Sequence, residues 1–106
     1  MKKHGQGKFT WSNGDWYDGE WVDDLRQGKG VMRSALTGDQ YEGEWHNDAR
    51  HGQGKFLWSG SGNVYEGEWR DGLMQGKGTL IFTNGEKYEG DWEKDKKNGY
   101  GNTIFK

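Results

Sequence analysis

Side chains able to do acid–base or metal chemistry are few in this chain. It has three His and no Cys among 106 residues. His4 and His51 each directly precede a Gly-x-Gly segment. The equivalent positions elsewhere hold amides: Gln27, Gln75 and Asn98. This interchange indicates a polar turn residue, and His46 occupies an unconstrained surface position with no second His at metal-ligand spacing. We therefore expect no catalytic residue, no metal and no cofactor.

Paired acids are the second candidate for chemistry. They recur two residues apart in four places: Asp18/Glu20, Glu42/Glu44, Glu66/Glu68 and Glu89/Asp91. Carboxylate catalysis needs two groups whose environments differ within one pocket, and a pattern repeated four times offers no such asymmetry. Lysines recur on the neighbouring segments: Lys8, Lys29, Lys55 and Lys77. The pattern therefore favours a solvated, salt-bridged sheet face.

Composition excludes several classes of partner. Lys and Arg number 15 against 17 Asp and Glu, a formal net charge of −2, so nothing draws the chain toward nucleic acid. The Gly-x-Gly pairs are not followed by the third glycine and helix of a dinucleotide site. No apolar run approaches the roughly 18 residues of a membrane span, and the lack of Cys fits a reducing compartment. We expect a cytoplasmic protein, with cytoskeletal or membrane association left open.

These residues belong to an internal repeat, which must determine where their side chains lie. The motif Tyr-x-Gly-[Glu/Asp]-Trp begins at Tyr17, Tyr41, Tyr65 and Tyr88, and each copy is followed by Gly-x-Gly. Spacings of 24, 24 and 23 residues are typical of arrays in which neighbouring units bury one another's faces. The expected division is 1–16 (partial), 17–40, 41–64, 65–87 and 88–106 (incomplete).

Each unit reads as two short strands. Strict alternation places Tyr, Gly and Trp on one face and the acids on the other. Asn13-Gly14 permits a two-residue or a three-residue hairpin loop. Only the three-residue loop pairs Phe9 with Tyr17 and gathers the rings and glycines on one face. Four-residue loops at 35–38 and 59–62 keep the same register in the longer units. The prediction is an all-β, elongated, single-layer antiparallel sheet of about nine strands, built from tandem hairpins.

The face that carries rings and glycines is the candidate binding surface. A ring can lie flat on a strand only where no Cβ intervenes, which predicts a structural role for ten glycines. These are Gly19, Gly28, Gly30, Gly43, Gly52, Gly54, Gly67, Gly76, Gly78 and Gly90. Because a single layer cannot bury both faces, some rings should remain accessible and contact a partner. The candidates are Tyr17, Trp21, Tyr41, Trp45, Tyr65, Trp69, Tyr88, Trp92, Phe56 and Trp58.

The four Tyr-x-Gly-[Glu/Asp]-Trp copies, each with its Gly-x-Gly, resemble the MORN (membrane occupation and recognition nexus) family over nearly the whole chain. The glycine usual after the Trp is matched only by Gly72, and Asp24, Asp48 and Asp95 stand at the other positions. The Pro common before the loop glycine is absent. The resemblance implies β-hairpin arrays that serve as interaction modules without catalysis, and phospholipid binding has been proposed for the family.

Two functions follow as hypotheses. The first is a non-catalytic scaffold that binds a protein or peptide on the aromatic, concave side, with self-association through sheet edges as a further option. The alternative is a peripheral membrane module that recognises phosphoinositides or other anionic phospholipids. Lipid recognition calls for a basic patch, and the chain offers only Lys94, Lys96 and Lys97, interrupted by Asp95. The scaffold is therefore favoured.

Overall fold

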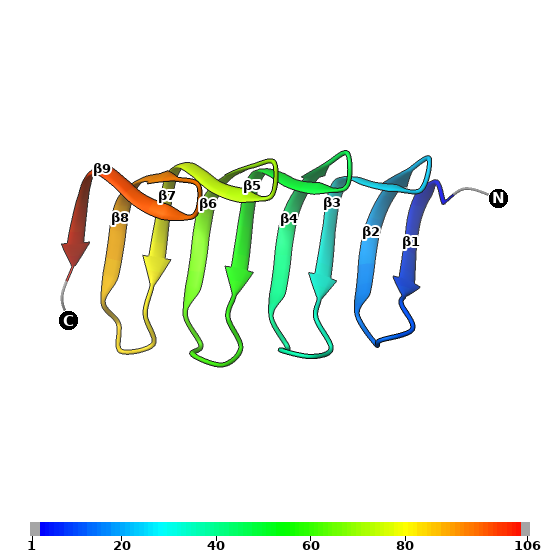
Figure 1. The fold of residues 1–106 in the computed structure, drawn as a ribbon, viewed down its shortest axis with the longest axis horizontal. Helices are drawn as coiled ribbons and strands as arrows, with labels where there is room; N and C mark the ends of the chain where they lie inside the picture. Colours follow the sequence, from blue (N-terminus) through cyan, green and yellow to red (C-terminus); the bar gives the residue numbers. More distant parts are fainter. Residues whose placement is uncertain (1–2, 105–106) are drawn as a thin grey trace.

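The chain forms one open antiparallel sheet in which the strands follow one another in sequence order (Figure 1). The structure, a computed structural model, describes residues 3–104, and for 98–102 and 104 it describes the backbone alone. The nine strands within that range are β1 Gly5–Thr10, β2 Trp16–Val22, β3 Leu25–Arg33, β4 Gln40–His46, β5 Ala49–Leu57, β6 Val64–Arg70, β7 Leu73–Ile81, β8 Lys87–Glu93 and β9 Lys96–Ile104. The molecule measures 50 × 24 × 17 Å, and its described part contains no helix able to cross a membrane.

The predicted strand register is confirmed. Phe9 faces Tyr17, with a three-residue loop in which the Gly14 N–H donates to the Trp11 carbonyl at 2.9 Å and Gly14 has φ +96°. In the longer unit Met32 faces Tyr41, and the additional residue lies in the four-residue loop. Insertions in the loop leave every face unchanged, because they fall outside the paired residues.

Two-residue turns join the strands at the ends opposite these loops. Their residues have positive φ: Asp23-Asp24, Asn47-Asp48, Asp71-Gly72 and Lys94-Asp95. This is the type I′ conformation, which suits the twist of a hairpin and which Asp and Asn tolerate better than most residues. The family's usual glycine can therefore be replaced without loss of the turn. A turn is also hydrogen-bonded to a strand of the previous repeat: the Asp48 N–H donates to the carbonyl of Arg26 in β3 at 2.9 Å.

Bulges bend every second strand pair. Gly19 faces Gly30 but Trp21 faces Arg26, so β3 carries two extra residues opposite Glu20. The Glu20 carboxylate accepts a hydrogen bond from the Lys29 N–H in this bulge at 2.6 Å. Such bulges increase the bend and twist of a sheet, and in Figure 1 the strand ends near the two-residue turns cross over the sheet.

The bulges also correct the sequence-based interpretation of the acids. Glu44 accepts the Gln53 N–H at 2.6 Å, and Glu68 accepts the Lys77 N–H. The second acid of each of these pairs is therefore half-buried against backbone and does not belong to a purely solvated face. Each of the corresponding glycines has positive φ and leaves the space that its carboxylate fills: Gly28, Gly52 and Gly76.

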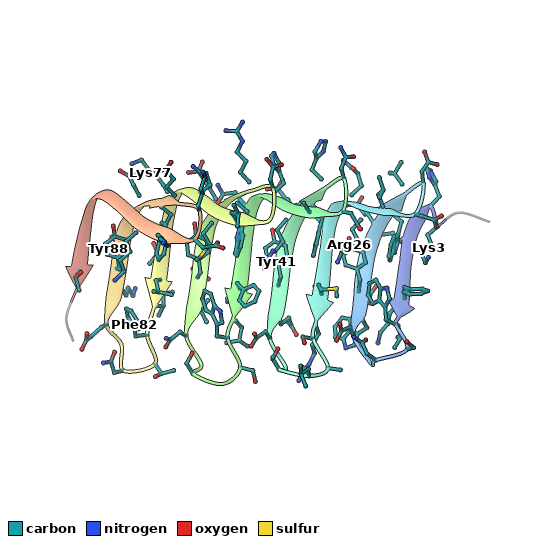
Figure 2. The ribbon with its side chains drawn as sticks, viewed as in Figure 1. Lys3, Arg26, Tyr41, Lys77, Phe82 and Tyr88 are labelled. Carbon is teal, nitrogen blue, oxygen red and sulfur yellow. The ribbon has the colours of Figure 1, made fainter. Side chains whose placement is uncertain are left out.

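The eight motif rings form the core. Each is at most 7% exposed: Tyr17, Trp21, Tyr41, Trp45, Tyr65, Trp69, Tyr88 and Trp92. The tyrosines at 17, 41 and 65 each touch their own Trp and the Trp of the next repeat edge-to-face, with ring centroids 4.9–5.4 Å apart. The result is one continuous ladder of rings along the array. Figure 2 shows Tyr41 and Tyr88 lying against the strands while Lys77 points away.

The expectation that some motif rings remain accessible is wrong, and the glycines explain why. Tyr41 lies on Gly54, where an added Cβ would stand 2.5 Å from ring atoms Cε1 and Cζ. Trp69 reaches back over the same strand and donates its indole N–H to the Gly54 carbonyl at 3.2 Å. Because the tyrosines at 17, 41 and 65 are each covered by the Trp of the next repeat and lie on glycine backbone, a bent single layer buries one face without a second layer.

The remaining glycines of the predicted set lie in the same row. A Cβ at Gly43 would stand 2.5 Å from the Cα of Gly54, so the two facing strands approach through bare backbone. Their equivalents pair in the same way: Gly19 with Gly30, Gly67 with Gly78, and Gly90 with Gly101. These pairings support the predicted structural role.

Candidate ligand-binding groove

Above the buried ladder lies a second tier of partly exposed hydrophobic side chains. It consists of Phe9, Trp11, Met32, Phe56, Trp58 and Leu80. Phe56 and Trp58 lie ring to ring, with centroids 4.8 Å apart. Of the ten aromatic residues expected to contact a partner, these two are the ones that the structure leaves reachable without unfolding.

A groove of about 500 Å³ opens beside this tier. Its apolar lining comes from Met32, Tyr41, Trp45 and Phe56, and its polar lining includes Arg26, Arg50 and Asp48. Gly72 closes one side, and the loop after β3 closes another. An apolar recess with a few polar groups is typical of ligand sites.

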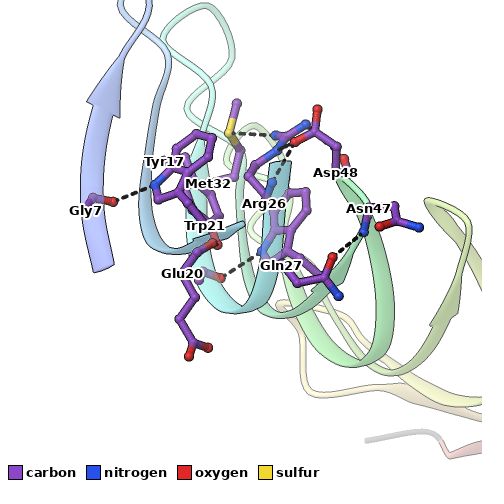
Figure 3. Close-up of polar contacts among 11 residues, drawn as sticks. Gly7, Tyr17, Glu20, Trp21, Arg26, Gln27, Met32, Asn47 and Asp48 are labelled. Atoms are coloured by element: carbon purple, nitrogen blue, oxygen red, sulfur yellow. Dashed lines mark hydrogen bonds and ion pairs between the residues drawn. The ribbon is translucent and has the colours of Figure 1, made fainter. Parts of the chain in front are cut away.

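Arg26 illustrates how a cation is held beside the ladder (Figure 3). Its guanidinium lies 4.5 Å from the ring centroid of Trp45, and its Nε donates to Oδ1 of Asp48 at 2.6 Å. It also donates to the Asp48 carbonyl at 3.0 Å and to Sδ of Met32 at 3.4 Å. Burial alone would raise the pKa of Asp48, but hydrogen bonds from Arg26 and its charge lower it below the usual value.

Arg50 occupies the same place one repeat later but lacks the carboxylate. Its guanidinium lies 4.7 Å from the Trp69 centroid and 5.4 Å from that of Phe56. The facing turn is Asp71-Gly72, and the guanidinium donates to the Gly72 carbonyl at 2.9 Å. Within the described part of the chain no carboxylate forms an ion pair with it. Burial lowers the pKa of Arg50, and the more distant charge of Asp95 opposes this.

Comparison with protein families identifies the architecture. A model described as "MORN repeat" matches residues 2–16, 17–35, 41–62, 65–87 and 88–106. The chain belongs to the MORN-repeat family. A search of curated proteins found no match. MORN repeats form modules that are often involved in binding, which agrees with an open groove beside the ring ladder.

The opposite face of this MORN sheet is shallow and charged. A recess of about 830 Å³ runs over the glycine row between side chains of both signs, among them Lys29, Glu42 and Lys55. Lys55 forms an ion pair with Glu66 at 3.5 Å, which agrees with the prediction of a salt-bridged face. Lys8 instead lies 4.7 Å from the ring of Trp16. Exposed pairs of this kind contribute at most about 1 kcal/mol each.

The structure brings together two histidines that the sequence analysis treated separately. The rings of His46 and His51 have centroids 5.4 Å apart beside the turn at Asn47. His51 Nδ1 is buried and has no hydrogen-bond partner, whereas the equivalent Gln27 accepts the Asn47 N–H at 3.0 Å. Among the side chains that the structure describes, no group of three His, Cys, Asp or Glu could hold a metal ion.

Sequence reasoning missed the arginines of the groove, although a signal was present. A basic residue stands two positions before four of the five Gly-x-Gly segments: Lys3, Arg26, Arg50 and Lys97. For the first three of these residues, the second position of the following two-residue turn holds Asp24, Asp48 and Gly72, respectively. Pairing these two patterns requires knowing that a turn lies against a strand of the previous repeat, and that contact is tertiary.

Proposed function

We propose that this MORN array is a non-catalytic interaction module that binds an extended peptide segment of a partner protein in the groove. The observation that carries the proposal is the partly exposed ring of Phe56, which lies 5.4 Å from the guanidinium of Arg50 and contacts the partly exposed ring of Trp58. Aromatic side chains and Arg are the types most enriched where proteins bind one another. Burial of the motif rings limits the contact to this second tier.

The proposal includes a cytoplasmic site of action and needs neither a cofactor nor nucleic acid. The titratable groups that line the groove are arginines, aspartates and a buried tyrosine. The arginine–aspartate pair of Arg26 and Asp48 is engaged in positioning a turn. The hydroxyls of Ser34 and Thr37 accept from backbone N–H groups, and among the described lining residues no hydroxyl donates to a carboxylate as an activated nucleophile would. A binding role fits these groups better than catalysis does. Self-association through a sheet edge stays a secondary proposal, tested by sedimentation of the purified chain.

Anionic phospholipid is the alternative ligand, and one feature favours it. A recess of about 290 Å³ beside the last turn is lined by Lys94, Lys96 and Lys97 together with Glu93. Each basic group near an anionic membrane surface contributes about 1 kcal/mol, and an adjacent acid opposes that attraction. With Asp95 in the same turn, the cluster carries little net charge. Phospholipid is therefore a weaker candidate ligand than a peptide.

Site-specific photocrosslinking tests the primary proposal. The photoreactive residue p-benzoylphenylalanine replaces Trp58 in one chain and Arg70, exposed on the opposite face, in the control. Crosslinked peptides identified by mass spectrometry are expected from position 58 and not from position 70. Equal crosslinking at both positions, or none at position 58, would contradict the groove proposal. Circular dichroism confirms that both chains are folded.

Vesicle sedimentation separates the two ligand classes. Phosphatidylcholine vesicles are compared with vesicles containing a phosphoinositide, at low and at physiological salt. We expect no binding at physiological salt, because the lysine cluster is interrupted by acids. Headgroup-dependent binding that persists there, and that is lost on changing Lys96 and Lys97 to Gln, would replace the peptide proposal by the lipid one.

A further inference from the structure

The repeats share a contact in which one turn supplies a carboxylate to the strand of the previous repeat. Oδ1 of Asp48 accepts the Arg26 N–H at 3.0 Å as well as its side-chain Nε. Asp24 likewise accepts from the Lys3 N–H and pairs with the Lys3 ammonium at 3.7 Å. Asp95 accepts the Met74 N–H at 2.7 Å. The third turn breaks this rule, because Gly72 has no side chain.

Without a carboxylate at Gly72, the guanidinium of Arg50 has an empty position beside it where the equivalent Arg26 has Asp48. A guanidinium has five N–H donors in a fixed fork, and the acceptor that the described chain offers Arg50 is the Gly72 carbonyl. A Cβ placed on Gly72 would meet nothing within 4 Å, so the space that Asp48 fills in the previous repeat is open here. The position adjoins the groove that Phe56 and Met32 line.

We propose that this position is a subsite for a carboxylate of the bound peptide, an Asp or Glu side chain that takes the place Asp48 takes beside Arg26. This inference rests on the proposed function, since it names the chemistry of the segment that enters the groove. A charge-assisted hydrogen bond to a half-buried Arg is among the stronger polar contacts in proteins, because the Arg is already partly removed from water. The repeat at 41–64 thereby selects a peptide in which an acidic residue pairs with Arg50 and a neighbouring apolar residue packs on Phe56.

The lining of the groove favours a carboxylate over a phosphate group. Arg50 is the cation with open donors, whereas the donors of Arg26 are engaged by Asp48 and Met32. Asp39 and Asp48 line the same groove. A group of nearly two negative charges would be repelled by these acids, whereas a single carboxylate matches the single open cation.

The test uses a capped tripeptide, acetyl-Phe-Asp-Leu-amide, and its Asn counterpart. Binding to the full chain is followed by nitrogen-15 NMR of the Arg50 Nε–Hε group and the Trp69 indole N–H. We expect the Asp peptide to saturate both signals and to bind at least about tenfold more tightly than the Asn peptide, as loss of a charged hydrogen-bond partner implies.

Gly72→Asp supplies the carboxylate from within the chain and should abolish this preference. The substitution fits the turn, because Asp48 has φ +71° at the equivalent position and Gly72 has φ +83°. Arg70→Gln on the opposite face changes the net charge by the same amount and should leave the preference intact. Conversely, Asp48→Gly exposes Arg26 and should create a second binding event.

The outcomes separate this inference from the proposed function. If both peptides bind equally and Gly72→Asp has no effect, the carboxylate subsite is refuted while the groove remains a peptide site. If neither peptide shifts the Trp69 signal, and position 58 yields no crosslinks, both proposals fail together. Loss of the Asp preference in Arg70→Gln as well would also refute the subsite, since the effect would then be one of net charge.

Discussion

The contact of a tyrosine ring with bare backbone is the feature of this fold that one methyl group can test. In Gly54→Ala, the new Cβ would stand 2.5 Å from Cε1 and Cζ of Tyr41 and closer still to its hydroxyl. The backbone of Gly54 has little freedom to retreat, because it pairs with Gly43 on one side and Gly67 on the other. The ring must therefore leave its place.

The cost follows from what the ring loses. Tyr41 is 2% exposed, and its hydroxyl donates to the Glu44 carbonyl at 2.8 Å. Exposing roughly half of the 150–250 Å² that a buried aromatic covers costs about 2–3 kcal/mol at about 25 cal/mol per Å². The lost hydrogen bond adds about 1 kcal/mol. We expect the free energy of unfolding to fall by about 3–4 kcal/mol.

Urea unfolding followed by tryptophan fluorescence and by far-ultraviolet circular dichroism measures this change. Gly60→Ala is the matched control, because a Cβ at Gly60 meets nothing within 4 Å and its φ is not in the left-handed region. Its effect should stay within about 0.5 kcal/mol. Adding Tyr41→Phe to Gly54→Ala should restore little, since Cε1 and Cζ remain. A Gly54→Ala chain as stable as the control would refute the ring-on-backbone packing.

Three further outcomes are expected. Burial raises the pKa of Tyr17 and Tyr65 to about 12, whereas tyrosine in the unfolded chain ionises near pH 10. Their contribution to stability is therefore intact below pH 10 and is lost as the pH rises from 10 to 12. The absorbance of these two tyrosines at 295 nm and the circular dichroism of the chain should change together. Ionisation of Tyr17 or Tyr65 near pH 10 with an unchanged circular dichroism spectrum would contradict this. Glu44→Gln should cost about 1 kcal/mol by weakening the bond to the bulge amide, whereas Glu42→Gln on the same strand should cost less than about 0.5 kcal/mol in urea unfolding. Trp69→Phe should lose about 1–2 kcal/mol with its indole hydrogen bond, and an unchanged thermal midpoint would argue against that bond.

The sequence alone determined which residues pair within each hairpin. Period-two alternation and loop length together leave one register that keeps rings and glycines on one face, and Phe9 opposite Tyr17 follows from it. The repeat spacing determined the order of strands, since consecutive hairpins of equal length extend one sheet. These features are local, because each depends on residues separated by a short turn.

Only the tertiary structure decided what the two faces do. The bend at the bulges places the tyrosines at 17, 41 and 65 under the Trp of the next repeat, binds Glu44 to backbone, and brings His46 beside His51. It also sets the turn that carries Gly72 against Arg50, where the previous repeat sets an Asp. Alternation states which side of a strand a residue is on, but it does not contain the bend or twist of the sheet. Contacts between residues about 20 positions apart depend on that curvature, and so they appear only when the repeats are stacked.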